Sequence, residues 1–181
     1  EQCDDGNTKN GDGCNQYCKL EIPNRIFVTS QTFKGNFGGI SKADINCQTI
    51  VNTRNLGGTW KAWMSDSKNS ASSRLVHSTV AYKTMDGKII ANNWSDLVDG
   101  TLQNAINVTE LNTQLASREQ VWTGTYASGN LVKGATCNNW NSYKSIFKGE
   151  VGLVSSKVSG WTARGVSTCN NLRHLYCVQQ S

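Results

Sequence analysis

Near its C-terminus the chain reads Cys169-Asn170-Asn171-Leu172-Arg173-His174-Leu175-Tyr176-Cys177-Val178-Gln179. The apolar and aromatic side chains of residues 173–179 predict a strand that closes a sheet. The remaining cysteines of the chain are Cys3, Cys14, Cys18, Cys47 and Cys137. The fold therefore depends on whether these seven cysteines bind a metal or one another.

Disulfide bonds explain the cysteines better than zinc does. Zinc sites usually combine close pairs such as C-x2-C with histidines, whereas the closest spacing here is Cys14–Cys18 and both histidines lie far from it. We therefore expect disulfides and an oxidising compartment. Two explanations remain for the odd count. Either Cys3, Cys14 and Cys18 belong to a four-cysteine unit whose first member precedes Glu1, or one thiol is free or bonded to another molecule.

Composition and charge narrow the class of protein. The 181 residues suit one main domain with a small appendage. No apolar run approaches the roughly 18 residues of a membrane span, and a charged fraction of 17% with dispersed tryptophans argues against disorder. Residues 1–24 hold five acidic and two basic side chains, whereas residues 25–181 hold eight acidic and sixteen basic ones. The excess of positive charge in residues 25–181 favours anionic partners such as sulfated glycans or acidic proteins. The alternative is that these residues form a solvated basic surface without a partner.

Residues 1–22 are expected to form a first, cysteine-rich unit. Between Cys3 and Cys14 almost no apolar side chain is available for a core, so covalent or ionic bonds must hold the unit. One interpretation is a calcium loop supplied by Asp4, Asp5, Asn7, Asn10 and Asp12. The glutamate that an EF-hand needs at position twelve is absent, and ordinary Asx-turns are the other interpretation. Pro23 marks the linker to the next unit.

Residues 25–181 predict a strand-dominated α+β domain. Ser41 with Asp44 indicates a helix N-cap, and Ala43, Cys47, Ile50 and Val51 share one face of a helix that stops near Gly57-Gly58. A hairpin is expected at 82–91 around Asp86-Gly87. Further strands are expected at residues 25–30, 59–65, 106–109, 121–125, 152–155 and 173–179, and a long loop at 126–146.

The C-terminal segment quoted above resembles the last two cysteines of C-type lectin-like domains. That resemblance implies a bridge from Cys177 back to Cys47 on the first helix, and a second bridge between Cys137 and Cys169. Residues 121–124 (V-W-T-G) look like the W-I-G-L strand of that fold, and Gly160-Trp161-Thr162 looks like its W-N-D strand.

Residues 25–179 more specifically resemble the bacterial lectin-like, endostatin-like family of surface proteins. The matching segments are Arg25–Ser30, L-G-G-T-W-K-A-W at 56–63, A-N-N-W at 91–94 and H-L-Y-C at 174–177. Residues 2–21 look like a cysteine-rich repeat of bacterial secreted proteins. The resemblance implies a secreted or cell-surface module, adhesin-like, that recognises a glycan or an extracellular-matrix, host or prey surface ligand.

Two departures from the lectin pattern argue against its usual calcium site. Pro23 is the only proline, so the cis-proline sugar-binding loop is missing. The W-N-D position reads Trp161-Thr162-Ala163, which loses both side-chain ligands. Calcium-independent binding of sugar or protein is therefore expected, and the N-terminal unit is the candidate place for calcium.

The candidate ligand-binding residues follow Cys137. They are Asn138, Asn139, Trp140, Asn141, Tyr143 and Lys144, together with Arg164. Amides bond sugar hydroxyls and an exposed tryptophan stacks on sugar faces. The alternative is that Trp140 packs beneath the loop while the asparagines form turns. The same two interpretations apply to Asn92-Asn93-Trp94. Lys148, Lys157 and Arg173 could join Lys144 and Arg164 in one basic face for an anionic glycan.

Catalysis is not expected. His174 lies in the closing strand, where packing explains it, and the acid-poor second half offers only Glu119 and Glu150 for carboxylate chemistry. No nucleic-acid partner is expected either. The leading hypothesis is therefore an extracellular binding module. The alternative is a structural tip or spacer domain of a larger surface or fibre protein.

Overall fold

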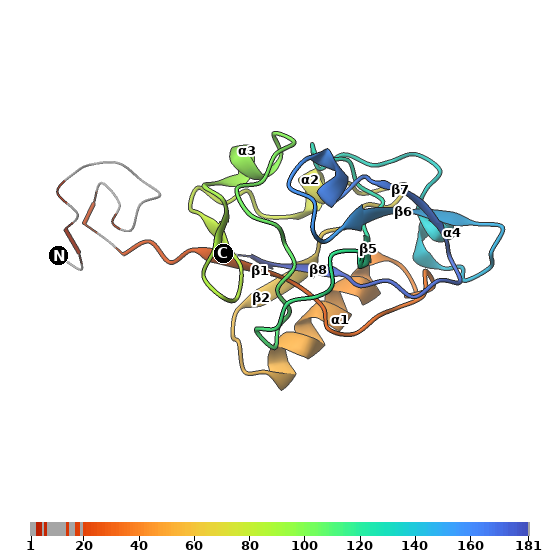
Figure 1. Ribbon diagram of the computed structural model, residues 1–181, viewed down its shortest axis with the longest axis horizontal. Helices are drawn as coiled ribbons and strands as arrows, with labels where there is room; N and C mark the ends of the chain where they lie inside the picture. Colours follow the sequence, from red (N-terminus) through yellow and green to blue (C-terminus); the bar gives the residue numbers. More distant parts are fainter. Residues whose placement is uncertain (1–2, 5, 7–13, 15–16, 19, 181) are drawn as a thin grey trace.

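A computed structural model describes residues 3–4, 6, 14, 17–18 and 20–180 (Figure 1). In chain order the elements are β1 (Asn24–Val28), α1 (Ile40–Thr53), β2 (Thr59–Ala62), α2 (Ala71–Arg74), β3 (Tyr82–Lys83), β4 (Ile89–Ala91), α3 (Trp94–Leu97), β5 (Gln120–Trp122), α4 (Cys137–Trp140), β6 (Lys148–Leu153), the 3-10 turn η1 (Ser159–Trp161), β7 (Gly165–Thr168) and β8 (Tyr176–Gln180). Within these described ranges α1, with 14 residues, is the only helix longer than four residues. The predicted strand-dominated α+β class is confirmed.

Two sheets organise the domain. The larger has the strand order β2-β8-β1-β3-β4, with β1 parallel to β3 and the other pairs antiparallel. The smaller is an antiparallel sheet with the order β5-β6-β7. A parallel bridge between Val121 and His174 connects them. In Figure 1, β1 and β8 cross the centre of the molecule side by side, and α1 lies beneath them.

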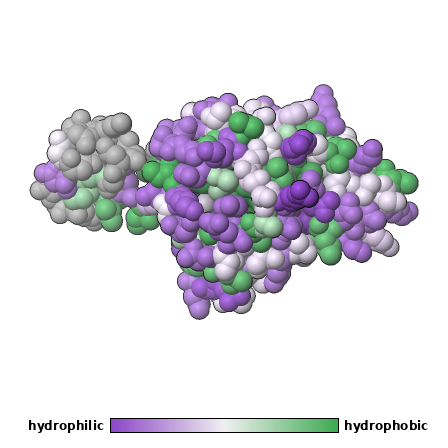
Figure 2. Space-filling view, viewed as in Figure 1, coloured by the Kyte–Doolittle hydropathy of each residue, from purple (hydrophilic) through white to green (hydrophobic). Residues whose placement is uncertain are grey.

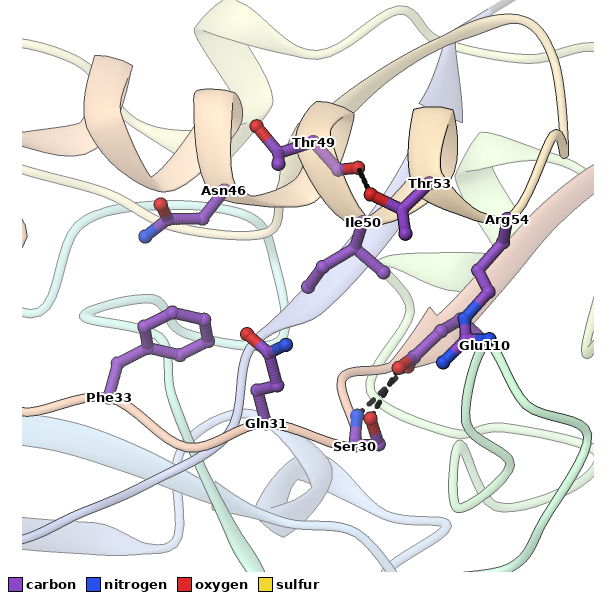
Figure 3. Close-up of a pocket in the computed structure, with 9 residues that line it drawn as sticks. All are labelled: Ser30, Gln31, Phe33, Asn46, Thr49, Ile50, Thr53, Arg54 and Glu110. Atoms are coloured by element: carbon purple, nitrogen blue, oxygen red, sulfur yellow. Dashed lines mark hydrogen bonds between the residues drawn. The ribbon is translucent and has the colours of Figure 1, made fainter.

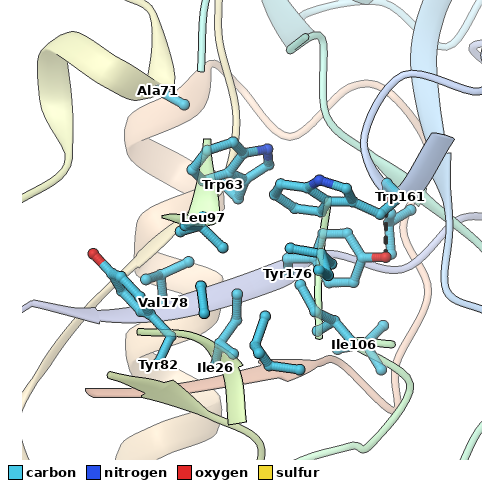
Figure 4. Packing of buried hydrophobic residues seen from close by; sticks show 14 of the residues in the cluster. Ile26, Trp63, Ala71, Tyr82, Leu97, Ile106, Trp161, Tyr176 and Val178 are labelled. Carbon is cyan, nitrogen blue, oxygen red and sulfur yellow. Dashed lines mark hydrogen bonds between the residues drawn. The ribbon is translucent and has the colours of Figure 1, made fainter. Parts of the chain in front are cut away.

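The central strands separate two hydrophobic cores, because successive side chains of a strand point to opposite faces. Ile26 and Tyr176 face a core with Trp63 and Trp161, shown in Figure 4. Phe27 instead faces a second core under α1. The predicted core tryptophans are confirmed, since all four are at most 1% exposed: Trp60, Trp63, Trp122 and Trp161.

Helix α1 buries the predicted face but begins elsewhere than expected. Ala43, Cys47, Ile50 and Val51 are buried as the period predicts. The predicted N-cap at Ser41 is wrong, because Gly39 occupies that position with φ 92°. Asp44 serves a tertiary contact instead: its carboxylate accepts the Ala62 backbone N–H at 2.8 Å and pairs with the Arg74 guanidinium.

Three disulfides are present in the described part of the chain. Cys47–Cys177 joins α1 to β8, and Cys137–Cys169 joins α4 to the turn after β7. Both bridges match the pairing that the resemblance implies. The third bridge, Cys3–Cys14, lies in the N-terminal unit.

Two strand predictions need correction, and one strand has no counterpart among the predictions. Residues 106–109 form no strand, and only isolated bridges involve Val108 and Thr109. Gly160-Trp161-Thr162 is not a strand, because Ser159–Trp161 forms η1. The strand after it, β7, was not predicted. Its sequence Gly165-Val166-Ser167-Thr168 has a single large apolar side chain, and that side chain is exposed at the sheet edge.

Candidate functional site: a groove lined by two arginines

The residues after Cys137 form a left-handed turn, not an exposed aromatic platform. Cys137, Asn138, Asn139 and Trp140 have φ values of 47°, 55°, 54° and 61°, a conformation that side chains with a Cβ rarely adopt in succession. Trp140 is 0% exposed, and its Nε1 donates to the Ser65 carbonyl at 2.8 Å. The assignment of Trp140 as a stacking residue is therefore wrong, because its ring is packed beneath the loop.

The neighbouring polar residues divide into structural and exposed groups. Asn139 Oδ1 accepts the Ser67 backbone N–H at 2.9 Å, and Asn141 Nδ2 donates to the Asn139 carbonyl at 2.8 Å. Asn138 is exposed, and Tyr143 is 57% exposed with Lys34 Nζ over its ring at 6.0 Å. Two of the three predicted asparagines of this loop are thus used in hydrogen bonds within the protein, one of them to the segment around Ser67.

Asn93 and Trp94 are likewise structural. Asn93 Oδ1 accepts the Asp96 N–H at the start of α3. Trp94 is 8% exposed and is covered by the His77 ring, whose centroid lies 4.1 Å away.

The predicted basic residues lie at both ends of the β6–β7 pair and in the segments next to it. The Lys144 carbonyl accepts the Phe147 N–H before β6, whereas the Arg164 N–H donates to Val151 at the far end of the β6–β7 pair. Lys157 is exposed beside the Thr101–Val158 bridge. Arg173 is held by Leu172 O and Ser167 Oγ, and its burial lowers the pKa of its guanidinium.

Arg164 shares a groove with a different arginine, Arg118. Arg118 and Arg164 line one open groove of about 450 Å³, at the end of the small sheet where β5 and β6 pair. The other lining residues are Ser117, Gln120, Val151, Leu153, Gly165 and Val166. Arg118 was not selected from the sequence, since only the pairing of β5 with β6 and β6 with β7 brings it near Arg164.

Neither nearby carboxylate of the described chain lines this groove. Glu119 Oε2 lies 3.3 Å from Nε2 of His174, whose Nδ1 contacts the Thr29 carbonyl at 2.6 Å. Glu150 is 6% exposed, and its Oε1 accepts the Gly165 N–H at 2.7 Å. Burial raises the pKa of the Glu150 carboxyl, and the Gly165 hydrogen bond opposes that rise. The charged side chains that line the groove itself are therefore the two guanidinium groups.

Substituting Glu150→Gln should flatten the pH dependence of stability. The folded state binds the Glu150 proton more tightly than the unfolded chain, so wild-type stability falls as pH rises from the ordinary value of 4.5 through the raised pKa. Glutamine retains an acceptor for Gly165 but does not ionise. Urea unfolding across this pH range should show that the free energy of unfolding of the variant rises relative to that of the wild type as the pH rises. Parallel curves would contradict the expectation.

The residues of the candidate calcium loop named in the sequence analysis, Asp4, Asp5, Asn7, Asn10 and Asp12, are described only in part. Asp4 Oδ1 accepts the Gly6 N–H at 2.8 Å, as in an Asx-turn. Asp5, Asn7, Asn10 and Asp12 lie outside the described residues. Among the residues that are described, no three His, Cys, Asp or Glu side chains gather as a metal site would require. Cys18 is half-buried.

No helix in the described ranges is long and apolar enough to cross a membrane. On the face seen in Figure 2, green apolar residues lie in small groups between polar ones. This face therefore presents no broad apolar surface.

Comparison with known proteins places the chain in a family. No curated protein matches its sequence. The family described as "Protein of unknown function (DUF1554)" matches residues 30–157, more than half of the chain. The matched region includes α1, β5, β6 and Arg118, and it ends before Arg164. The chain thus belongs to the DUF1554 family.

Proposed function

We propose that this protein is an extracellular binding module that holds an anionic ligand, such as a sulfated glycan of a host or prey surface, in the Arg118–Arg164 groove. The observation that carries the proposal is the pair of arginines in an open groove without a lining carboxylate among the described residues. Guanidinium groups bind sulfate and carboxylate with paired, charge-assisted hydrogen bonds. The groove volume is that of an ordinary ligand site.

The C-type lectin-like fold is part of the same proposal. It is supported by the bridge from the first helix to the closing strand and by the second bridge across the loop region. Disulfides form and persist in oxidising compartments, which supports a secreted or cell-surface location. An adhesin-like binding role, and not catalysis, is the function we infer.

Ligand binding is proposed to be independent of the lectin calcium site. Thr162, at the position of the lectin asparagine, is 0% exposed. Its Oγ1 donates to the Thr125 carbonyl at 2.9 Å and accepts from Trp63 Nε1 at 2.8 Å. This hydroxyl serves the core, so the donor set does not suit a calcium ion there.

Removing both arginines should weaken binding of a sulfated polysaccharide. We expect Arg118→Ser/Arg164→Ser to raise the Kd for heparin at least about tenfold, because hydrogen bonds to charged groups contribute about 1.5–3 kcal/mol each. Calorimetry on the full chain, with desulfated heparin as the reference ligand, measures the change. Wild-type affinity should also fall with added salt.

The matched control is Lys133→Ser/Lys157→Ser, which removes the same charge from exposed lysines that do not line the groove. Its Kd should stay within about threefold of wild type. Equal losses in both double variants would mean that overall charge, and not the groove, attracts the ligand. Equal binding of sulfated and desulfated heparin would overturn the anionic-ligand proposal.

A further inference from the structure

A second pocket opens between α1 and the chain segment that follows β1 (Figure 3). Its volume is about 140 Å³, well below the roughly 300 Å³ at which pockets for drug-sized ligands begin. Only a small molecule or one terminal unit of a chain would fit. The residues that matter for its chemistry are Gln31, Phe33, Asn46, Ile50, Arg54 and Glu110.

The apolar part of this pocket is rigidly placed. Ile50 is 8% exposed and belongs to the core under α1. Phe33 is half-buried, and its backbone exchanges two hydrogen bonds with Arg173, at 2.7 and 2.9 Å. Its ring packs against Phe37 with centroids 6.0 Å apart and offers an aromatic surface to a bound molecule.

Two side-chain amides in the pocket have unused hydrogen-bonding capacity. Within the described part of the chain, the side chains of Gln31 and Asn46 bond to no other residue. Gln48, on the same helix, instead uses its amide fully, bonding Asn52, Gly58 and the Trp60 N–H. Figure 3 shows Gln31 rising from the segment after β1 and Asn46 projecting from α1. An amide both donates and accepts, so the pair suits vicinal hydroxyl groups.

A fixed carboxylate lies at one end of the pocket. Glu110 is 7% exposed, and its oxygens accept the Ser30 backbone N–H at 2.9 Å and the Ser30 hydroxyl. Each oxygen retains a lone pair for a further donor. Arg54, which is exposed, lines the same end (Figure 3).

We propose that this pocket binds a single neutral sugar ring, independently of the arginine groove. Glu110 disfavours an anion and Arg54 disfavours a cation, because each would place like charges together. An apolar ligand would leave the amides and the carboxylate desolvated without partners. A polyhydroxylated ring supplies donors and acceptors for the amides and an apolar face for Phe33.

The test is a titration of the isotopically labelled full chain with glucose, galactose, mannose or N-acetylglucosamine, followed by amide NMR signals. At least one sugar should shift the side-chain NH2 signals of Gln31 and Asn46 and the backbone signal of Ser30. The double variant Gln31→Ala/Asn46→Ala should raise the Kd at least about tenfold. Both positions are accessible, and alanine favours the helix at position 46, so the variant should fold.

Two controls separate this site from the arginine groove. Asn170→Ala removes an exposed amide outside the pocket and should leave the Kd unchanged. Arg118→Ser/Arg164→Ser should also bind the sugar as the wild type does, even where heparin binding is lost. The proposal is overturned if none of the sugars shifts the pocket signals. Shifts produced by glycine but by no sugar would likewise overturn it in favour of a zwitterion.

Discussion

Replacing Cys47 and Cys177 together by alanine is expected to lower the free energy of unfolding by about 5 kcal/mol. The bridge joins residues 130 positions apart, so its removal restores the freedom of a very long loop to the unfolded chain. Domains of this kind are stable by roughly 5–15 kcal/mol in total. The variant should therefore unfold at much lower denaturant concentration, which circular dichroism in guanidinium chloride measures.

The matched comparison is Cys137→Ala/Cys169→Ala, which opens a bridge between residues 32 positions apart. Loop-closure entropy predicts a smaller loss of about 4 kcal/mol. Both cysteine pairs are fully buried, so truncation of the side chains should contribute similarly in each. A larger loss for the shorter loop would show that native-state packing, and not the unfolded chain, determines what these bridges contribute.

Substituting Gly152→Ala should destabilise the protein by about 3 kcal/mol or more. An added Cβ would lie 1.9 Å from the Trp161 carbonyl oxygen and 2.9 Å from Thr162 Cα. These are backbone atoms beside a tryptophan core, so they do not move aside at low cost. A loss of this size corresponds to a fall in Tm of roughly 6–12 °C, and near-UV circular dichroism would report disturbed packing of Trp161.

Gly160→Ala is the control, because this glycine adjoins the same tryptophan in η1. Its added Cβ would meet only side-chain atoms, at 3.2 Å from Ser156 Oγ and 3.4 Å from Arg164 Cδ. We expect its stability to stay within about 1 kcal/mol of wild type. Similar losses in the two variants would mean that backbone freedom, and not steric overlap, is what Gly152 provides.

Local patterns in the sequence predict the buried surfaces of this fold well. The 3.6-residue period identifies the buried face of α1, and alternation places Trp60, Ala62 and Met64 in one core. The Asp86-Gly87 turn predicts the hairpin, which Tyr82–Lys83 and Ile89–Ala91 form. Each of these signals is contained within about ten residues.

Features that depend on distant partners are predicted poorly. In the sequence Asp44 is typical of a helix start, but in the structure its carboxylate pairs with Arg74 and accepts the Ala62 backbone N–H. Trp140 follows two asparagines, and its burial arises from a left-handed turn and a hydrogen bond to Ser65. No local pattern distinguishes such a tryptophan from an exposed one.

The candidate site shows the same limit. The excess of basic residues near Arg118 and Arg164 is visible in the sequence, and it supports anion binding. Residues 111–181 contain seven lysines and arginines. Which two of these seven side chains line the same groove depends on how β5, β6 and β7 pair. The second pocket is still less visible, since residues 31, 46 and 110 come from three separate segments.

The antiparallel pairing of β1 with β8 has a mechanical consequence. Asn24 and Gln180 lie at the same end of this pair, where Ile26 is opposite Val178. Tension applied through the two flanking segments would therefore peel the strands apart one hydrogen bond at a time, the weakest loading geometry for a sheet. The covalent link from Cys177 to Cys47 would stop the peeling of β8 once its last three residues had detached, so the rest of β8 would stay attached to α1 under load.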